Sequence, residues 1–210
     1  MNYISHLQLA NYSQTSLVGS FLGDFVKGRD LSQFTEEQQI GILLHRKIDS
    51  FTDQHAEIIS MKRHFPDSIR RYAGIVLDIY YDHLLMSHWT DYSEPSSSNV
   101  FVSFYHELGQ VEYQENNRFT RVKANLLKHQ WLDSYVQERT CLDAMKSIES
   151  RFRHSANFAE LAFQVIRKNE ADLKESFKRF YPELMAMSLD IADDLKKEVA
   201  QRTAEQRSTC

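Results

Sequence analysis

Apolar residues recur along this chain at intervals of three and four, the spacing that lines one face of an α-helix. Thr35 and Gln38 have the pattern of a capping box, in which a Thr side chain caps the first turn. The helix that this pair opens has an apolar face made of Ile40, Leu43, Leu44, Ile48 and Phe51. We therefore predict a long amphipathic helix after residue 35.

Similar patterns predict helices over most of the remaining chain. One is expected at residues 16–27, ended by Gly28, and one from Pro66 onward. Further helical patterns lie at residues 100–115, 119–130, 132–150, 158–180 and 182–201, and Pro182 suits the first turn of the last one. Pro95 and a serine run indicate a loop at residues 90–99, either a linker or a flap over a site.

Composition supports an all-helical chain. The 210 residues include only 6 Gly and 3 Pro, and 42% of the chain is apolar. Few helix breakers and an apolar share large enough for a core favour one domain of this length. We predict an all-α, single-domain helical bundle over residues 1–210, with motifs in residues 1–90 and C-terminal helices at 98–201.

The net charge and the cysteine content limit which partners the protein is expected to bind and in which compartment it is expected to reside. The net charge is −4, so the protein as a whole is not expected to bind nucleic acid. Cys141 and Cys210 cannot form a disulfide framework, which suits a reducing cytoplasm. The first residues lack the pattern of a secretory signal, and no apolar run approaches the roughly 20 residues of a membrane helix. We expect a cytoplasmic protein without a membrane segment.

Acidic residues within apolar helical segments are the first candidate chemistry. Asp24 lies between Leu22 and Phe25, and Asp78 lies between Leu77 and Ile79. A carboxylate in such surroundings is costly to bury unless it is paired or binds a metal ion. The alternative for Asp24 is a solvent-facing side chain on an amphipathic helix.

His45, Asp49 and Asp53 follow one another at intervals of four residues. In an α-helix such side chains share one face, with Cβ atoms roughly 5–6 Å apart. The pair of His45 and Asp49 suits two metal ligands or a histidine oriented by a carboxylate, and the alternative is a plain polar face. His55 follows, and we expect it either to cap the helix or to approach the same site.

Asp78 and Asp82 repeat the four-residue spacing, and His83 follows. Two carboxylates on one helix face repel each other unless a cation lies between them. A metal site explains these helices together, and mixed carboxylate and imidazole ligands suit Mn²⁺, Fe²⁺ or Mg²⁺. The chain has no Cys-x-x-Cys, no His-Glu-x-x-His and no phosphate-binding glycine loop.

At these residues the sequence resembles the acyl carrier protein phosphodiesterases. The matching stretches are MNYISHL at 1–7, GSFLGDFVKG at 19–28, LHRKIDSFTDQH at 44–55 and RRYAGIVLDIYYDH at 70–83. The resemblance implies an all-α enzyme related to the HD phosphohydrolases with altered motif order, since Asp82-His83 replaces a His-Asp dipeptide. It also implies metal-dependent removal of 4′-phosphopantetheine from the serine of holo-acyl carrier protein.

The residues singled out above suggest roles in a metal-assisted hydrolysis. We expect one or two divalent ions, Mn²⁺ with Mg²⁺ or Fe²⁺ as alternatives, to be held by Asp24, His45, Asp49, Asp78 and Asp82. The ions would activate a water for attack on phosphorus. His83 or His6 is expected to donate a proton to the leaving group. Arg46 and Lys27 are candidates for holding phosphate oxygens, or are ordinary helix-end charges.

The implied protein substrate is a small acidic carrier and requires a basic docking face. The docking candidates closest in sequence to the site are Lys62, Arg63, Arg70 and Arg71. Two further basic clusters, at residues 118–128 and 151–168, are typical of solvated helix faces. Two other functions stay open, a phosphohydrolase of the HD type acting on a nucleotide or another small phosphoester, and a non-catalytic helical binding module.

Overall fold

The computed structural model describes residues 2–113, 117–152 and 157–208, and every regular element in these ranges is helical. The α-helices are α1 Tyr3–Tyr12, α2 Leu17–Leu22, α3 Glu36–Gln54, α4 Ala56–Lys62, α5 Ala73–Ser87, α6 Ser97–Gln110, α7 Asn117–His129, α8 Glu138–Glu149, α9 Ala159–Lys168 and α10 Glu170–Ser208. Three 3₁₀ helices are η1 Arg70–Tyr72, η2 Trp89–Asp91 and η3 Trp131–Val136. The predicted all-α class is confirmed, and none of the described helices is long and apolar enough to span a bilayer.

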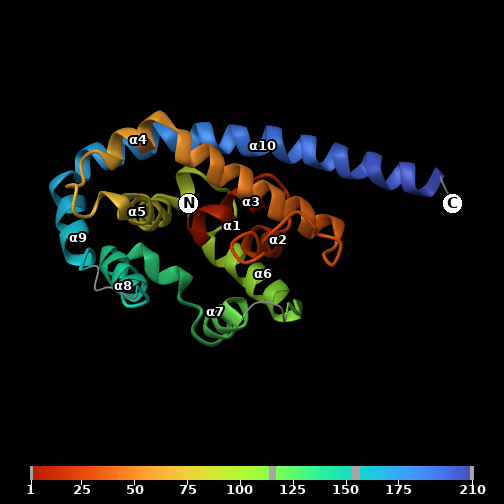
Figure 1. The fold of residues 1–210 in the computed structure, drawn as a ribbon, viewed down its shortest axis with the longest axis horizontal. Coiled ribbons are helices and arrows are strands. Elements are labelled where there is room, and N and C mark those ends of the chain that lie inside the picture. Colours follow the sequence, from red (N-terminus) through yellow and green to blue (C-terminus); the bar gives the residue numbers. More distant parts are fainter. Residues whose placement is uncertain (1, 114–116, 153–156, 209–210) are drawn as a thin grey trace.

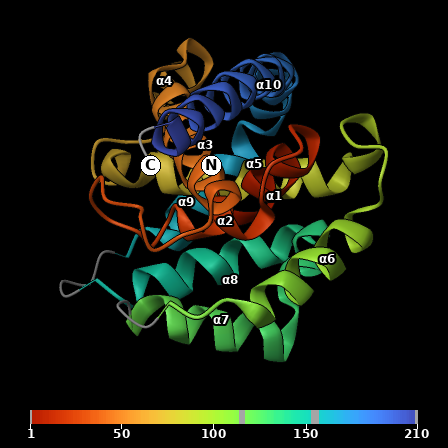
Figure 2. The same ribbon diagram turned by 90° about the vertical axis from the view of Figure 1, so that its right-hand side faces the viewer.

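Helix α1 lies at the centre of the molecule. The long helix α10 runs across α3 and α4 along one edge, while α6, α7 and α8 lie on the opposite side (Figure 1). The turned view shows the same two layers, with α1 and α2 between them (Figure 2). Because α1 contacts α2, α3, α5, α6 and α10, most of its side chains are buried. A polar residue on α1 is therefore held inside the protein.

Helices α2 and α3 cross at very short range. A Cβ atom placed on Gly41 would lie 2.7 Å from the backbone nitrogen of Ser20, and one on Gly19 would lie 2.7 Å from the carbonyl oxygen of Gln38. No side chain fits between the two backbones at these positions. The glycines thus allow α2 to lie directly on the first half of α3, which the Thr35–Gln38 capping box starts as predicted.

The structure corrects several predicted boundaries. The chain has a helix at Tyr3–Tyr12 that was not predicted, and the helix expected at 16–27 covers only Leu17–Leu22. The boundary expected at Pro182 is wrong, because α10 continues through this proline. Phe180, Tyr181 and Leu184 are fully buried on either side of it, so packing holds the helix where local preference would end it.

The predicted loop at 90–99 is shorter than expected. Its start lies in η2, and Ser96 caps α6 by accepting a hydrogen bond from the backbone N–H of Asn99. The serine run therefore begins a helix, as serine often does at an N-cap. The helix expected from Pro66 begins with η1 and becomes α-helical at Ala73.

Candidate functional site

His6, His45 and Asp49 form one cluster where α1 meets α3. The His6 Nε2 atom lies 3.0 Å from one Asp49 carboxylate oxygen, and the His45 Nε2 atom lies 3.2 Å from the other. The two imidazole rings are stacked with their centroids 3.8 Å apart. Both histidines are buried, whereas 44% of the Asp49 side chain is exposed. The cluster thus opens to solvent on the Asp49 side.

Local geometry and one glycine position this cluster. His45 and Asp49 are one helical turn apart on α3, so their side chains meet without any tertiary contact. Gly23, at the end of α2, packs against the His45 ring, and a Cβ atom there would lie 2.3 Å from the ring. The absent side chain leaves the space that the imidazole occupies.

The electrostatics of the cluster favour a neutral His6 ring beside an ionised Asp49 carboxylate. Burial lowers the pKa of His6 to about 4, and the neighbouring His45 adds to this effect. Burial also acts to raise the pKa of Asp49, but hydrogen bonds with His45 and His6 outweigh it and hold that pKa well below its usual range. At neutral pH the site therefore presents an uncharged His6 ring beside the negative charge of Asp49.

These three side chains fit a divalent metal ion. Their ligand atoms lie within 4.8 Å of one another, and they form the only group of this kind among the described residues. The Nδ1 atoms of His6 and His45 are buried without a hydrogen-bond partner. A buried polar atom without a hydrogen-bond partner costs about 1–3 kcal/mol. Packing alone therefore does not explain why two such rings are buried together. Neutral imidazole and carboxylate ligands are typical of Mn²⁺, Fe²⁺ and Zn²⁺ sites.

Two other predicted metal ligands lie beside the cluster. Burial raises the pKa of Asp78, and the carboxylates of Asp49 and Asp53 raise it further, so Asp78 is within electrostatic range of the cluster. Asp24 directly follows Gly23 and is half-buried. The structure thus joins His45 and Asp49 with His6, and leaves Asp24 and Asp78 as neighbours outside the three-residue group.

The last predicted ligand, Asp82, has other partners. Its two carboxylate oxygens accept hydrogen bonds from the backbone N–H groups of Ile4 and Ser5, both at 3.0 Å. These are groups of the first turn of α1, which have no partner inside the helix. Asp82 therefore caps the helix that carries His6, and it is fully buried.

His83 and Arg46 contact backbone carbonyl groups. The Nδ1 atom of His83 lies 2.8 Å from the carbonyl oxygen of Tyr135 in η3. One guanidinium nitrogen of Arg46 donates to the carbonyl oxygen of Val26, at 3.0 Å. These contacts hold His83 toward η3 and hold Arg46 against the segment after α2.

The predicted docking residues lie around α4 and η1, and three of the four have neighbours there. The ammonium group of Lys62 lies 3.1 Å from an Asp53 oxygen. Arg70 pairs with Asp67, and the guanidinium of Arg71 lies 4.7 Å from the centre of the Tyr72 ring. Arg63, the fourth, is exposed. Much of the positive charge of this surface therefore faces nearby acidic groups.

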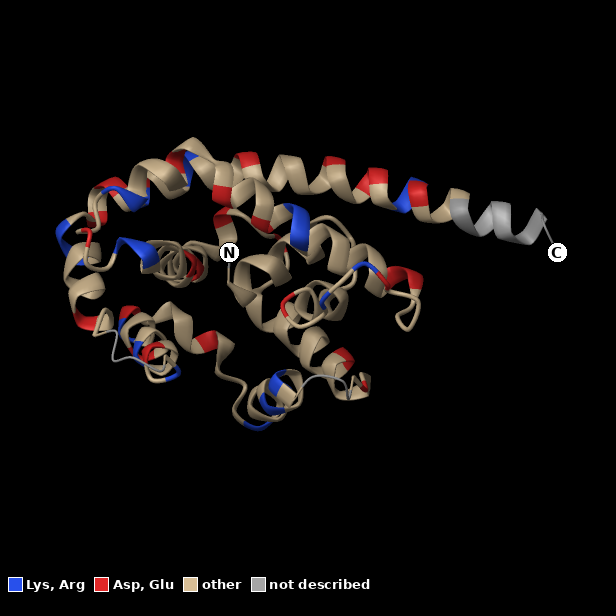
Figure 3. Ribbon diagram, viewed as in Figure 1, with Lys and Arg blue, Asp and Glu red and all other residues tan. Residues whose placement is uncertain are grey.

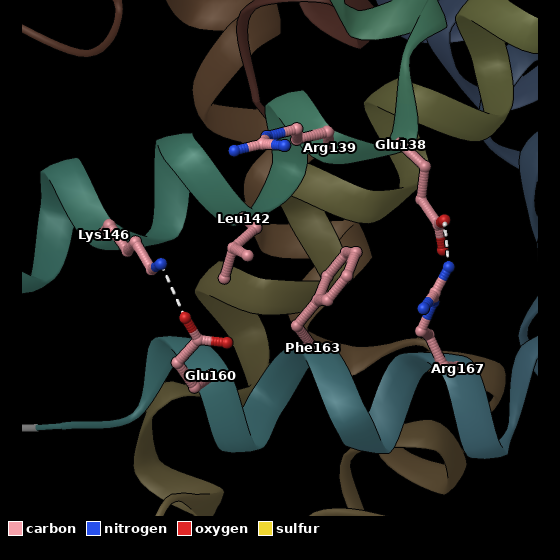
Figure 4. A pocket seen from close by; sticks show the side chains of 7 residues that line it. All are labelled: Glu138, Arg139, Leu142, Lys146, Glu160, Phe163 and Arg167. Carbon is pink, nitrogen blue, oxygen red and sulfur yellow. Dashed lines mark ion pairs between the residues drawn. The ribbon is translucent and has the colours of Figure 1, made fainter.

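A groove of about 440 Å³ lies between α8 and α9 (Figure 4). Leu142 and Phe163 lie between its walls, and the ion pairs Lys146–Glu160 and Arg167–Glu138 bridge the two helices. None of its lining residues belongs to α1, α3 or α5. The groove is therefore separate from the His6–His45–Asp49 cluster.

Sequence reasoning found His45 and Asp49 by spacing but gave His6 a different role. The role of His6 as a proton donor stays a prediction, and a pKa lowered to about 4 favours the neutral ring, which is a better metal ligand than a general acid at neutral pH. The available signal was the position of His6 between Ile4 and Leu7, which are both buried. Burial in apolar surroundings lowers the pKa of a histidine and favours its neutral form.

Comparison with known proteins gives a consistent result. The family described as acyl carrier protein phosphodiesterase matches residues 1–184. A protein of that name from Photorhabdus laumondii subsp. laumondii is 32% identical over 188 residues, which cover 88% of this chain and 93% of the relative. Another from Salmonella agona is 30% identical over 189 residues, which cover 90% of this chain and 97% of the relative. No solved structure matches the chain significantly.

Proposed function

This chain belongs to the acyl carrier protein phosphodiesterase family, and from that premise we propose that it hydrolyses the bond between 4′-phosphopantetheine and the serine of holo-acyl carrier protein. The products are the apo-carrier and free 4′-phosphopantetheine. The observation that carries the proposal is the His6–His45–Asp49 cluster, which lies within the residues that match the family. We further propose a cytoplasmic location, which suits the buried free thiol of Cys141.

We propose that His6, His45 and Asp49 hold a divalent ion, with Mn²⁺ or Fe²⁺ favoured over Mg²⁺ because two of the three ligands are imidazoles. When bound, such an ion stabilises the negative charge that develops on the phosphoryl oxygens. Asp49 orients both rings through its two oxygens, and Gly23 leaves room for the His45 ring. These contacts fix the ligand atoms before substrate arrives.

The chain also supplies a candidate for proton transfer. A general acid works best when its pKa is close to the working pH, and burial is the main cause that raises the pKa of Asp78. We propose that the Asp78 carboxyl gives a proton to the serine oxygen that leaves. His83 was expected in this role, but its Nδ1 atom faces the Tyr135 carbonyl in η3.

The direct test is incubation of the purified protein with holo-acyl carrier protein and Mn²⁺, followed by intact mass spectrometry of the carrier. We expect conversion to the apo form, and no conversion with the Asp49→Asn variant. An unchanged carrier mass with Mn²⁺, Fe²⁺ and Mg²⁺ would exclude the proposal. Hydrolysis of a nucleotide under the same conditions, with the carrier intact, would assign the site to a small phosphoester instead.

A further inference from the structure

Among the described helices, α7 has the largest excess of positively charged over negatively charged side chains. Its 13 residues, Asn117–His129, contain four cations and no acidic residue. We define Arg118, Arg121, Lys123 and Lys128 as the α7 basic face. Figure 3 shows blue but no red on this helix, whereas α4 and α10 carry both colours. The charge of α7 is thus not balanced within the helix.

This face is open to solvent. The buried side of α7 consists of Phe119 and Leu126, while Arg118, Arg121 and Lys128 are exposed. The ammonium group of Lys123 donates a hydrogen bond to the carbonyl oxygen of Val111, at the end of α6. Among the described residues, neither Arg121 nor Lys128 forms an ion pair with a carboxylate. Cations of α8 and α10, in contrast, pair with acids, as in Lys146–Glu160, Lys174–Glu170 and Arg179–Glu57.

Helix stability accounts for Lys128, which lies in the last turn, but not for the cations at the start of the helix. A cation in the first turn opposes the helix dipole, and Arg118 occupies that turn, which contains no acidic residue. Arg118 and Arg121 are three residues apart on one helix face, where like charges repel. A charge pattern that is unfavourable for the isolated helix becomes favourable when an acidic surface binds to it.

The α7 basic face adjoins the wall of the candidate site. Arg118 donates a hydrogen bond to the carbonyl oxygen of Asp24 at 3.3 Å, and its guanidinium lies 4.9 Å from the centre of the Phe25 ring. These two residues directly follow Gly23, which packs against His45. A protein that binds to α7 is therefore placed beside the His6–His45–Asp49 cluster.

We propose that the α7 basic face docks an acidic face of the carrier protein, so that the phosphodiester of the carrier reaches the cluster. This inference rests on the proposed function. The chain carries a net charge of −4, so attraction for an acidic partner has to come from a local basic face such as that of α7. The rival surface at Lys62, Arg70 and Arg71 has Asp53 and Asp67 beside its cations, which weakens its attraction for an acidic protein.

The test uses the Arg121→Glu/Lys128→Glu double variant, because neither side chain pairs with a carboxylate of the described residues and neither lies in the cluster. Binding of apo-acyl carrier protein, which lacks the phosphodiester, is measured by calorimetry at low and high salt. We expect the Kd of the double variant to rise at least about tenfold at low salt, with a weaker dependence on salt than in the wild type. The matched control is Arg70→Glu/Arg71→Glu, which makes the same charge change and should bind nearly as the wild type does.

Several results would overturn the docking proposal. These are an unchanged Kd for the α7 variant, an equal loss in both variants, no binding by the wild type, or equally tight binding of a single-stranded RNA to the same face. A wild type that binds the carrier but leaves holo-carrier intact would contradict the proposed reaction only. In that case the affinities of the two variants still decide whether α7 is the docking face.

Discussion

Asp82 holds Ser5 through two hydrogen bonds, one from the backbone N–H at 3.0 Å and one from the hydroxyl group at 2.5 Å. The second carboxylate oxygen accepts the N–H of Ile4. The next residue along α1 is His6, so a buried carboxylate on α5 fixes the start of the helix that brings this histidine to Asp49. Asp82 is in this way a positioning residue for the cluster.

We predict that Asp82→Ala destabilises the protein and weakens the site. The variant leaves two backbone N–H groups and a hydroxyl buried without an acceptor, at about 1–3 kcal/mol for each group. Urea unfolding should therefore show a loss of at least about 3 kcal/mol. Ser5→Ala removes one of the three bonds and serves as the milder control. A loss below that of Ser5→Ala would show that Asp82 does not hold α1.

The stability contributed by Asp82 should depend on pH. Burial raises the pKa of Asp82 to about 7, whereas an Asp in the unfolded chain titrates near about 3.9. Between these values the unfolded chain has released a proton that the folded protein keeps, so stability falls as the pH rises from about 4 to about 7. Asn at this position does not titrate.

The free energy of unfolding of the wild type minus that of Asp82→Asn should therefore be larger at pH 5 than at pH 7.5. Denaturant unfolding of both proteins at the two pH values measures this difference. A difference that stays constant would mean that Asp82 titrates at the same pH in the folded and unfolded states. A difference that grows with pH would mean that its pKa is lowered by the hydrogen bonds to α1.

Gly23→Ala should reduce activity more than its small size suggests. The added Cβ atom would lie 2.3 Å from the His45 ring, so the ring or the end of α2 must move. We expect kcat for holo-carrier to fall at least about tenfold, since small misplacements of catalytic groups are costly. Gly109→Ala is the matched control, because nothing lies within 4 Å of its added Cβ atom. This control should keep full activity, and normal activity in both variants would place His45 outside the reaction.

Removal of metal should stop hydrolysis if the cluster holds an ion. We expect EDTA to abolish activity and Mn²⁺ to restore it, while Asp49→Asn keeps the fold and loses both activity and Mn²⁺ binding. Isothermal titration with Mn²⁺ measures the binding, and circular dichroism checks the fold. Full activity in a sample shown to be metal-free by elemental analysis would contradict the metal hypothesis, and normal Mn²⁺ affinity in Asp49→Asn would place the ion elsewhere.

The sequence by itself determined the features that depend on local geometry. The capping box of Thr35 and Gln38 and the contact of His45 with Asp49 both follow from helical spacing, which is the same in any α-helix. The all-helical class followed from composition and periodicity. Motifs in the first part of the chain indicated the family that the comparisons then showed.

Only the tertiary structure decided which helix faces meet. His6 reaches Asp49 across 43 residues of sequence, and Asp82 caps α1 although its spacing from Asp78 suggested a shared metal site. Packing likewise carries α10 through Pro182. Spacing along a helix determines which side chains share a face. Which other helix packs against that face depends on how all the helices bury their apolar surfaces together. A carboxylate that binds a metal ion and one that caps a helix therefore have the same local pattern.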